Sequence, residues 1–104
     1  MSEFVRLTTV AEVPPGEARE FEVDGRVIAV FNLHDRFVAV DGVCPHQGGP
    51  LADGEVENGV VTCPWHGWRF HLETGTCPDA RRATIEVFPV KVEGDEILVA
   101  LPQG

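Results

Sequence analysis

Two short stretches of this chain bring together side chains that commonly bind metal ions. The first contains Cys44 and His46, and the second contains Cys63 and His66. Sixteen residues separate His46 from Cys63, which is enough for a strand, a turn and a returning strand. Each stretch offers one thiolate sulfur and one imidazole nitrogen, ligands that suit transition metals. Two cysteines on one side and two histidines on the other suit two metal ions in different ligand fields.

The residues around these four resemble a known family. Residues 44–51 (CPHQGGPL) and 63–70 (CPWHGWRF) resemble the two cluster loops of the Rieske ferredoxins. The pair Thr74-Gly75 resembles the turn that follows them, and residues 87–97 (VFPVKVEGDEI) resemble the end of a family member. The resemblance therefore covers most of the chain.

This resemblance implies a cofactor and a ligand set. It implies a Rieske-type [2Fe–2S] cluster with one iron bound by Cys44 and Cys63 and the other by His46 and His66. Neutral imidazole leaves the cluster less negative than four thiolates do, so the histidine-bound iron is the one expected to be reduced. The chain is then expected to be a one-electron carrier without catalysis of its own. Its expected partners are a flavin-containing ferredoxin reductase and a terminal oxygenase or reductase.

The apolar pattern predicts an all-β fold. Residues 21–23 and 26–31 are rich in Val, Ile and Phe and are joined by Asp24-Gly25, a strong hairpin signal, and Asn58-Gly59 is a second such turn before residues 60–62. Further strands are expected at 37–40, 67–72, 85–92 and 97–101, which gives seven to nine in all.

No stretch shows a sustained helical period, so the expectation is an antiparallel β-sandwich or small barrel of the Rieske type. We expect residues 1–104 to form one domain, with residues 42–75 as an inserted subdomain that carries the two cluster loops.

Composition narrows the choice of partners. The formal charge of −9 disfavours nucleic acid, whose phosphates attract positive charge. No apolar run of about 18 residues and no secretory leader is visible, so we expect a cytoplasmic protein without a membrane partner. An odd count of three cysteines argues against a disulfide framework. A monomer is expected.

Departures from the high-potential Rieske proteins of respiratory complexes bear on the redox potential. The resemblance implies that those proteins carry one more Cys in each loop, joined as a disulfide, where this chain has Gly49 and Trp65. They also have Ser and Tyr hydroxyls that donate to the cluster sulfurs, where this chain has Trp68 and Phe70. Without those donors, the potential is expected toward the bottom of the Rieske range of roughly −150 to +300 mV.

Several other residues of the cluster loops and their surroundings have weaker signals. Gly48, Gly49 and Gly67 would let the backbone approach the cluster closely and let N–H groups bond its sulfurs. Trp65 is open to two interpretations, partner contact and packing. Trp68 is expected mainly to pack.

Three further residues are of types that bind metals, but they lack ligand spacing. Cys77 is expected to be a small buried thiol. His34, in a polar turn, and His71, on a strand, have no thiol at ligand spacing and are not expected to bind metal.

Three alternatives remain open, and one of them, a redox or iron sensor bound to a regulatory partner, rests on no positive feature of the sequence. The small subunits of NADH-dependent nitrite reductases share the fold, although many have lost the ligands. A structural zinc module also uses two Cys and two His, but zinc fingers usually keep like ligands together in each knuckle.

Overall fold

The computed structural model describes residues 2–43, 49–65, 67–78 and 84–102. They form ten short strands and two single 3₁₀ turns. The strands are β1 (Ser2–Thr9), β2 (Ala18–Val23), β3 (Arg26–Asn32), β4 (Phe37–Asp41), β5 (Glu55–Glu57), β6 (Val60–Thr62), β7 (Arg69–His71), β8 (Val87–Phe88), β9 (Val90–Glu93) and β10 (Glu96–Pro102). The 3₁₀ turns are η1 (Val10–Glu12) and η2 (Leu51–Asp53). The described residues contain no α-helix, so the predicted all-β class is confirmed.

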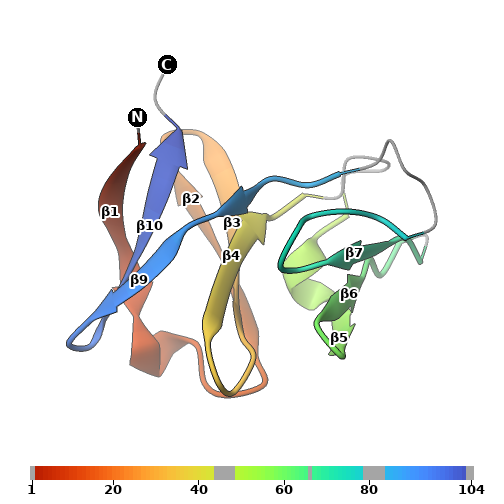
Figure 1. The fold of residues 1–104 in the computed structure, drawn as a ribbon, viewed down its shortest axis with the longest axis horizontal. Coiled ribbons are helices and arrows are strands. Elements are labelled where there is room, and N and C mark those ends of the chain that lie inside the picture. Colours follow the sequence, from red (N-terminus) through yellow and green to blue (C-terminus); the bar gives the residue numbers. More distant parts are fainter. Residues whose placement is uncertain (1, 44–48, 66, 79–83, 103–104) are drawn as a thin grey trace.

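The strands form three antiparallel sheets (Figure 1). One sheet has the order β1-β10-β9 and a second has the order β2-β3-β4-β8. The third consists of the hairpin β5-β6 and strand β7, and it lies to one side of the other two. We call the first two sheets the base and the third sheet, with the loops that join it, the outer layer.

The two predicted hairpin turns are present. Asp24 and Gly25 have φ values of 51° and 77° between β2 and β3, and Asn58 and Gly59 have values of 54° and 76° between β5 and β6. Positive φ at both central residues is the conformation whose twist matches two antiparallel strands. The sequence therefore identified both turns and the strands β2, β3 and β6 beside them, whereas β5 was not predicted.

In the sheet β2-β3-β4-β8, the inner strands β3 and β4 are mostly buried on both of their faces. Along β3, Ile28 and Val30 pack into a core shared with β10, whereas Ala29 and Phe31 pack into a second core shared with the outer layer. All four side chains are at most 1% exposed. Since full burial of a large apolar side chain stabilises by about 1.5–3 kcal/mol, this strand joins base and outer layer energetically.

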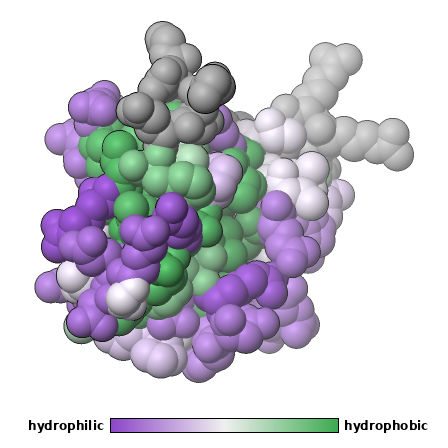
Figure 2. Space-filling model, turned by 60° about the vertical axis from the view of Figure 1, so that its left-hand side comes forward, coloured by the Kyte–Doolittle hydropathy of each residue, from purple (hydrophilic) through white to green (hydrophobic). Residues whose placement is uncertain are grey.

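The outer face of the sheet β1-β10-β9 is mixed in character. Figure 2 shows apolar residues along the middle of this side of the molecule, between bands of hydrophilic residues. Phe4 on β1 and Val92 on β9 are 42% and 46% exposed. The Lys91 ammonium lies 4.9 Å from the centre of the Phe4 ring, so a cation covers part of this apolar surface.

Three details differ from the sequence-based expectations. Strand β1 was not predicted, and the expected count of seven to nine strands is therefore too low. The single strand expected at 85–92 is two strands, β8 and β9, separated by Pro89. Proline has no N–H to give to a sheet, and only its carbonyl is used here, as an acceptor from the Ala100 N–H at 3.0 Å. The strand expected at 67–72 is shorter, Arg69–His71.

No helix among the described residues is long and apolar enough to span a bilayer.

Candidate metal centre

The first predicted ligand loop is closed at its base. Val43 and Pro50 form an isolated antiparallel bridge, and the Leu51 N–H donates to the Gly42 carbonyl at 3.0 Å. The chain therefore leaves β4 and returns to η2 at nearly the same point. Cys44 and His46 belong to the segment between these contacts and lie outside the described residues.

The second loop joins β6 to β7 through a tight turn. The Cys63 N–H donates to the Trp68 carbonyl at 2.7 Å, and the Gly67 N–H donates to the Cys63 carbonyl at 3.0 Å. Gly67 has a φ of +74°, which explains why glycine is favoured there. These two N–H groups bond backbone oxygens and thereby close the turn. His66 lies outside the described residues.

Cys63 is the one predicted ligand in the described part of the chain, and it is buried. It is 1% exposed and belongs to the core that also contains Val61, Phe70 and Leu72. Strand β6 ends directly before it, so the sheet holds the backbone at this point. The thiol is fixed by packing rather than carried on a free loop.

The two loops meet at Cys63. A Cβ built on Gly49 would lie 2.8 Å from Cys63 Sγ, closer than real Cβ contacts allow, and 3.0 Å from Trp65 Cγ, which is tighter than most. The first loop thus brings bare backbone against the sulfur of the second. Gly49 was expected to permit a close approach, and its described neighbours are this thiol and the Trp65 ring. Because the two ligand-bearing segments touch here, and because they carry two thiols and two imidazoles, the donor set fits a Rieske-type cluster.

The other two histidines do not belong to the core around Cys63. His34 is exposed in the β3–β4 turn, where its backbone N–H donates to Asn32 Oδ1 at 2.9 Å. His71 is exposed on β7. Within the described ranges, no group of three or more His, Cys, Asp or Glu side chains is placed to hold a metal ion.

Cys77 is 4% exposed and packs in the same core as Cys63. It is thus the small buried thiol that the sequence suggested. Trp68 is half-buried against this core, also as expected.

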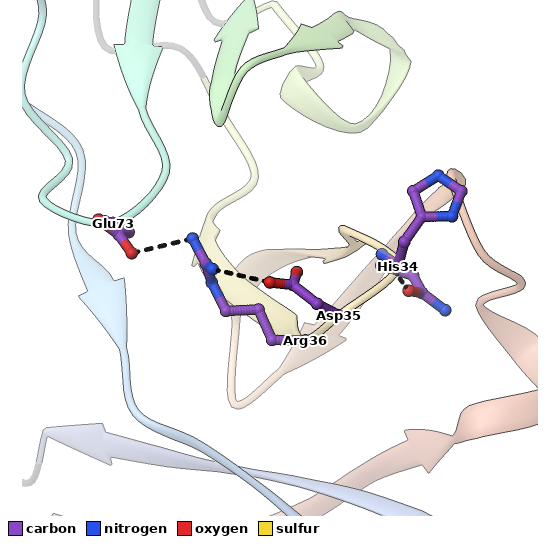
Figure 3. Close-up of polar contacts among 5 residues, drawn as sticks. His34, Asp35, Arg36 and Glu73 are labelled. Atoms are coloured by element: carbon purple, nitrogen blue, oxygen red, sulfur yellow. Dashed lines mark hydrogen bonds and ion pairs between the residues drawn. The ribbon is translucent and has the colours of Figure 1, made fainter.

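One feature near His34 was not foreseen from the sequence. Arg36 Nη2 lies 2.9 Å from Glu73 Oε1 and Arg36 Nη1 lies 3.4 Å from Asp35 Oδ2, so an ion pair joins the β3–β4 turn to the loop after β7 (Figure 3). A cavity of about 930 Å³ opens beside this turn and is bordered by β5. Neither Cys63 nor Trp65 lines it.

The fold and the paired loops define a small metal-binding β-protein, and comparison with known proteins gives its family. Residues 3–99 match the family model of the Rieske [2Fe-2S] domain. The chain belongs to this family, and membership implies a Rieske-type [2Fe–2S] cluster as its cofactor.

Three similar proteins illustrate the range of the family. The ferredoxin component of an alkene monooxygenase system from Xanthobacter autotrophicus is 35% identical over 98 residues, which cover 93% of this chain and 80% of that protein. A ferredoxin solved in complex with the oxygenase of carbazole 1,9a-dioxygenase has a TM-score of 0.83 at 28% identity, over 93% of this chain and 92% of that one. A protein described as a putative NADH-dependent nitrite reductase small subunit from Mycobacterium tuberculosis has a TM-score of 0.90 at 26% identity, over 100% and 99%.

Proposed function

We propose that this chain carries single electrons on a [2Fe–2S] cluster bound by Cys44 and Cys63 on one iron and by His46 and His66 on the other. The observation that carries this proposal is the contact of Gly49 with Cys63 Sγ, which joins the two ligand-bearing segments at a buried thiol. When bound, the cluster supplies a one-electron couple.

The residues of this chain have distinct tasks in that proposal. Cys63 provides an anionic sulfur from a position fixed by the core. The imidazoles of His46 and His66 bind the iron that is reduced, and they are the groups through which an electron leaves toward a docked protein.

The proposed partners are a flavin-containing reductase as electron donor and a terminal oxygenase as acceptor. Support comes from the similar ferredoxin components, one of which was solved in complex with its oxygenase. The charge of −9 would speed encounter with a partner that has a basic docking face. The chain acts here as a component of an oxidoreductase system rather than as its catalyst. The cytoplasmic location and the monomeric state remain predictions.

A nitrite reductase small subunit is the second candidate. The high structural similarity to such a protein favours it, with a TM-score of 0.90 over the whole chain. Copurification with a large sirohaem enzyme would favour this candidate, whereas reduction by a ferredoxin reductase with transfer to an oxygenase would favour the first.

The proposed redox potential is low. Phe70 is fully buried among apolar side chains and has no hydroxyl to donate to a cluster sulfur. Hydrogen bonds to sulfur stabilise the reduced, more negative state, so their loss lowers the potential. A midpoint toward the bottom of the roughly −150 to +300 mV Rieske range is expected, and a value above zero would contradict it.

Substitution of the histidines tests the ligand set. The reduced, reconstituted protein is expected to give a Rieske electron paramagnetic resonance spectrum, and His46→Ser or His66→Ser is expected to abolish it. His34→Ser and His71→Ser are matched controls at exposed positions and should leave the spectrum unchanged.

Two outcomes would overturn the assignment. If the control variants and the ligand variants lose the spectrum alike, the four residues do not form the site. If metal analysis finds one zinc ion and no inorganic sulfide, the zinc module replaces the cluster.

A further inference from the structure

Trp65 combines high exposure with a close contact at the predicted ligands. It is 57% exposed, the most exposed of the large apolar side chains in the described part of the chain. Its neighbour Cys63 is 1% exposed. One face of the indole therefore meets solvent while the residue two positions earlier is shielded.

The inner side of the Trp65 ring lies on Gly49. A Cβ on Gly49 would lie 3.0 Å from Cγ and 3.2 Å from Cδ2 of the ring, and 2.8 Å from Cys63 Sγ. The ring and the sulfur therefore lie against the same point of the first loop. Gly49 is itself buried, so the indole lies beside the buried point at which the first loop meets this sulfur.

We propose that Trp65 is a positioning residue that covers the Cys63 side of the metal centre and holds the two ligand loops together. This inference rests on the proposed function. Packing of the ring across Gly49 resists separation of the loops, and this slows loss of the bound cluster. Exclusion of water also disfavours the reduced state, which carries one more negative charge, and so holds the potential down.

The glycine is required by this contact rather than by backbone conformation. Gly49 is not among the residues with positive φ, in contrast to Gly67 in the second loop. A side chain at position 49 would have to displace either the ring or the sulfur. Gly49 and Trp65 thus form one packing contact between the two ligand loops.

The test compares Trp65→Ala and Trp65→Phe with Phe4→Ala. Phe4 is an exposed aromatic residue on β1 and serves as the matched control. The first measurement is the rate at which a chelator bleaches the visible absorption of the holoprotein. Trp65→Ala is expected to lose its cluster about tenfold faster, which corresponds to about 1.4 kcal/mol of barrier. Trp65→Phe should largely restore the rate, and Phe4→Ala should leave it unchanged.

The second measurement is the midpoint potential, which a purely partner-binding role would not alter. Trp65→Ala is expected to raise it, because water then solvates the reduced state, and Trp65→Phe should lie between Trp65→Ala and the unmodified protein. If Trp65→Ala keeps both the bleaching rate and the midpoint of the unmodified protein, the ring does not cover the centre and the inference is wrong.

The third measurement separates this inference from the proposed function. In cluster-free protein, iodoacetamide labelling followed by peptide mass spectrometry reports Cys63 separately from Cys44 and Cys77. Trp65→Ala should increase labelling of Cys63 several-fold and leave that of Cys77 unchanged, and equal labelling of Cys63 in both proteins would contradict the cover. A protein that binds no sulfide would overturn the proposed function, and the labelling result would still decide on the contact.

Discussion

The base and the outer layer of this protein obtain their stability in different ways. The two sheets of the base enclose a core supplied almost wholly by their own strands, including Ile28, Val30, Ile97 and Val99. In the outer layer the strands have only three residues each, and β5 is exposed along its whole length. Its core is completed by residues of loops and by the far face of the base. The core inside the base is therefore supplied mainly by its own strands, whereas the core of the outer layer depends on loops and on the base.

The proposed cofactor is bound in part by the outer layer. Cys63 is itself a core residue of the outer layer. Metal binding at this thiol would add stability to the outer layer, because a ligand that binds only the folded state stabilises it. We expect loss of the cluster to destabilise the outer layer more than the base.

Truncation of one core residue in each region should distinguish the contributions of the two cores to the free energy of unfolding. Phe70→Ala removes the largest fully buried side chain of the outer strands, and Ile97→Ala removes a fully buried one of the base. Expected losses in free energy of unfolding are about 3–5 kcal/mol for Phe70→Ala and about 2–5 kcal/mol for Ile97→Ala. Denaturant titration followed by circular dichroism measures both.

Cluster retention distinguishes the two variants. Phe70 packs in the same core as Cys63 and Ile97 does not. Visible absorption under mild denaturant should therefore bleach earlier in Phe70→Ala than in Ile97→Ala at matched overall stability. Coincident bleaching at matched stability would show that the two regions unfold as one unit.

Two glycines with positive φ provide a smaller contrast between the regions. Gly75, after β7 in the outer layer, has a φ of +79°, and a Cβ there would clash with the Ile85 carbonyl oxygen. Gly94, in the β9–β10 turn of the base, has a φ of +61° and open space around it. Gly75→Ala is expected to cost about 3 kcal/mol and Gly94→Ala about 1 kcal/mol, because only the first adds overpacking to backbone strain.

Thermal or denaturant unfolding of both variants checks this difference. Equal losses would mean that the backbone around Ile85 relaxes to admit a methyl group. The Ile85 N–H donates to the Gly75 carbonyl at 2.8 Å, and this hydrogen bond opposes such a movement.

The sequence predicted what local patterns encode. Asp24-Gly25 and Asn58-Gly59 specify hairpins because both residues of each pair tolerate positive φ, and the neighbouring apolar residues then form the strands. Strand β1 was missed because its partner is β10, at the other end of the chain. Its stability comes from a pairing across about 90 residues, for which the local sequence has no signal.

At the candidate site, too, the sequence predicted local patterns but not contacts between distant residues. The four ligands could be predicted from their types and spacing, because metal chemistry restricts ligands to few residue types. The packing of Trp65 on Gly49 could not be predicted, because it depends on the path of the fifteen intervening residues, and the sequence left packing and partner contact open. The Arg36–Glu73 pair, whose members are 37 positions apart, was missed for the same reason.

This ion pair gives the smallest expected effect, although it directly joins the base to the outer layer (Figure 3). The side chains of Arg36 and Glu73 are 45% and 70% exposed, so solvent screens their attraction. In Glu73→Gln, Arg36 also keeps Asp35 as a nearby carboxylate. We expect Glu73→Gln to cost at most about 0.5 kcal/mol at low salt and nothing measurable at about 1 M salt. Asp35→Asn is the control, because it removes a carboxylate from the same arginine without touching the outer layer. A loss of about 2 kcal/mol in the free energy of unfolding that persists in high salt would contradict this expectation. It would show that this turn, rather than the core containing Phe31 and Phe70, holds the two regions together.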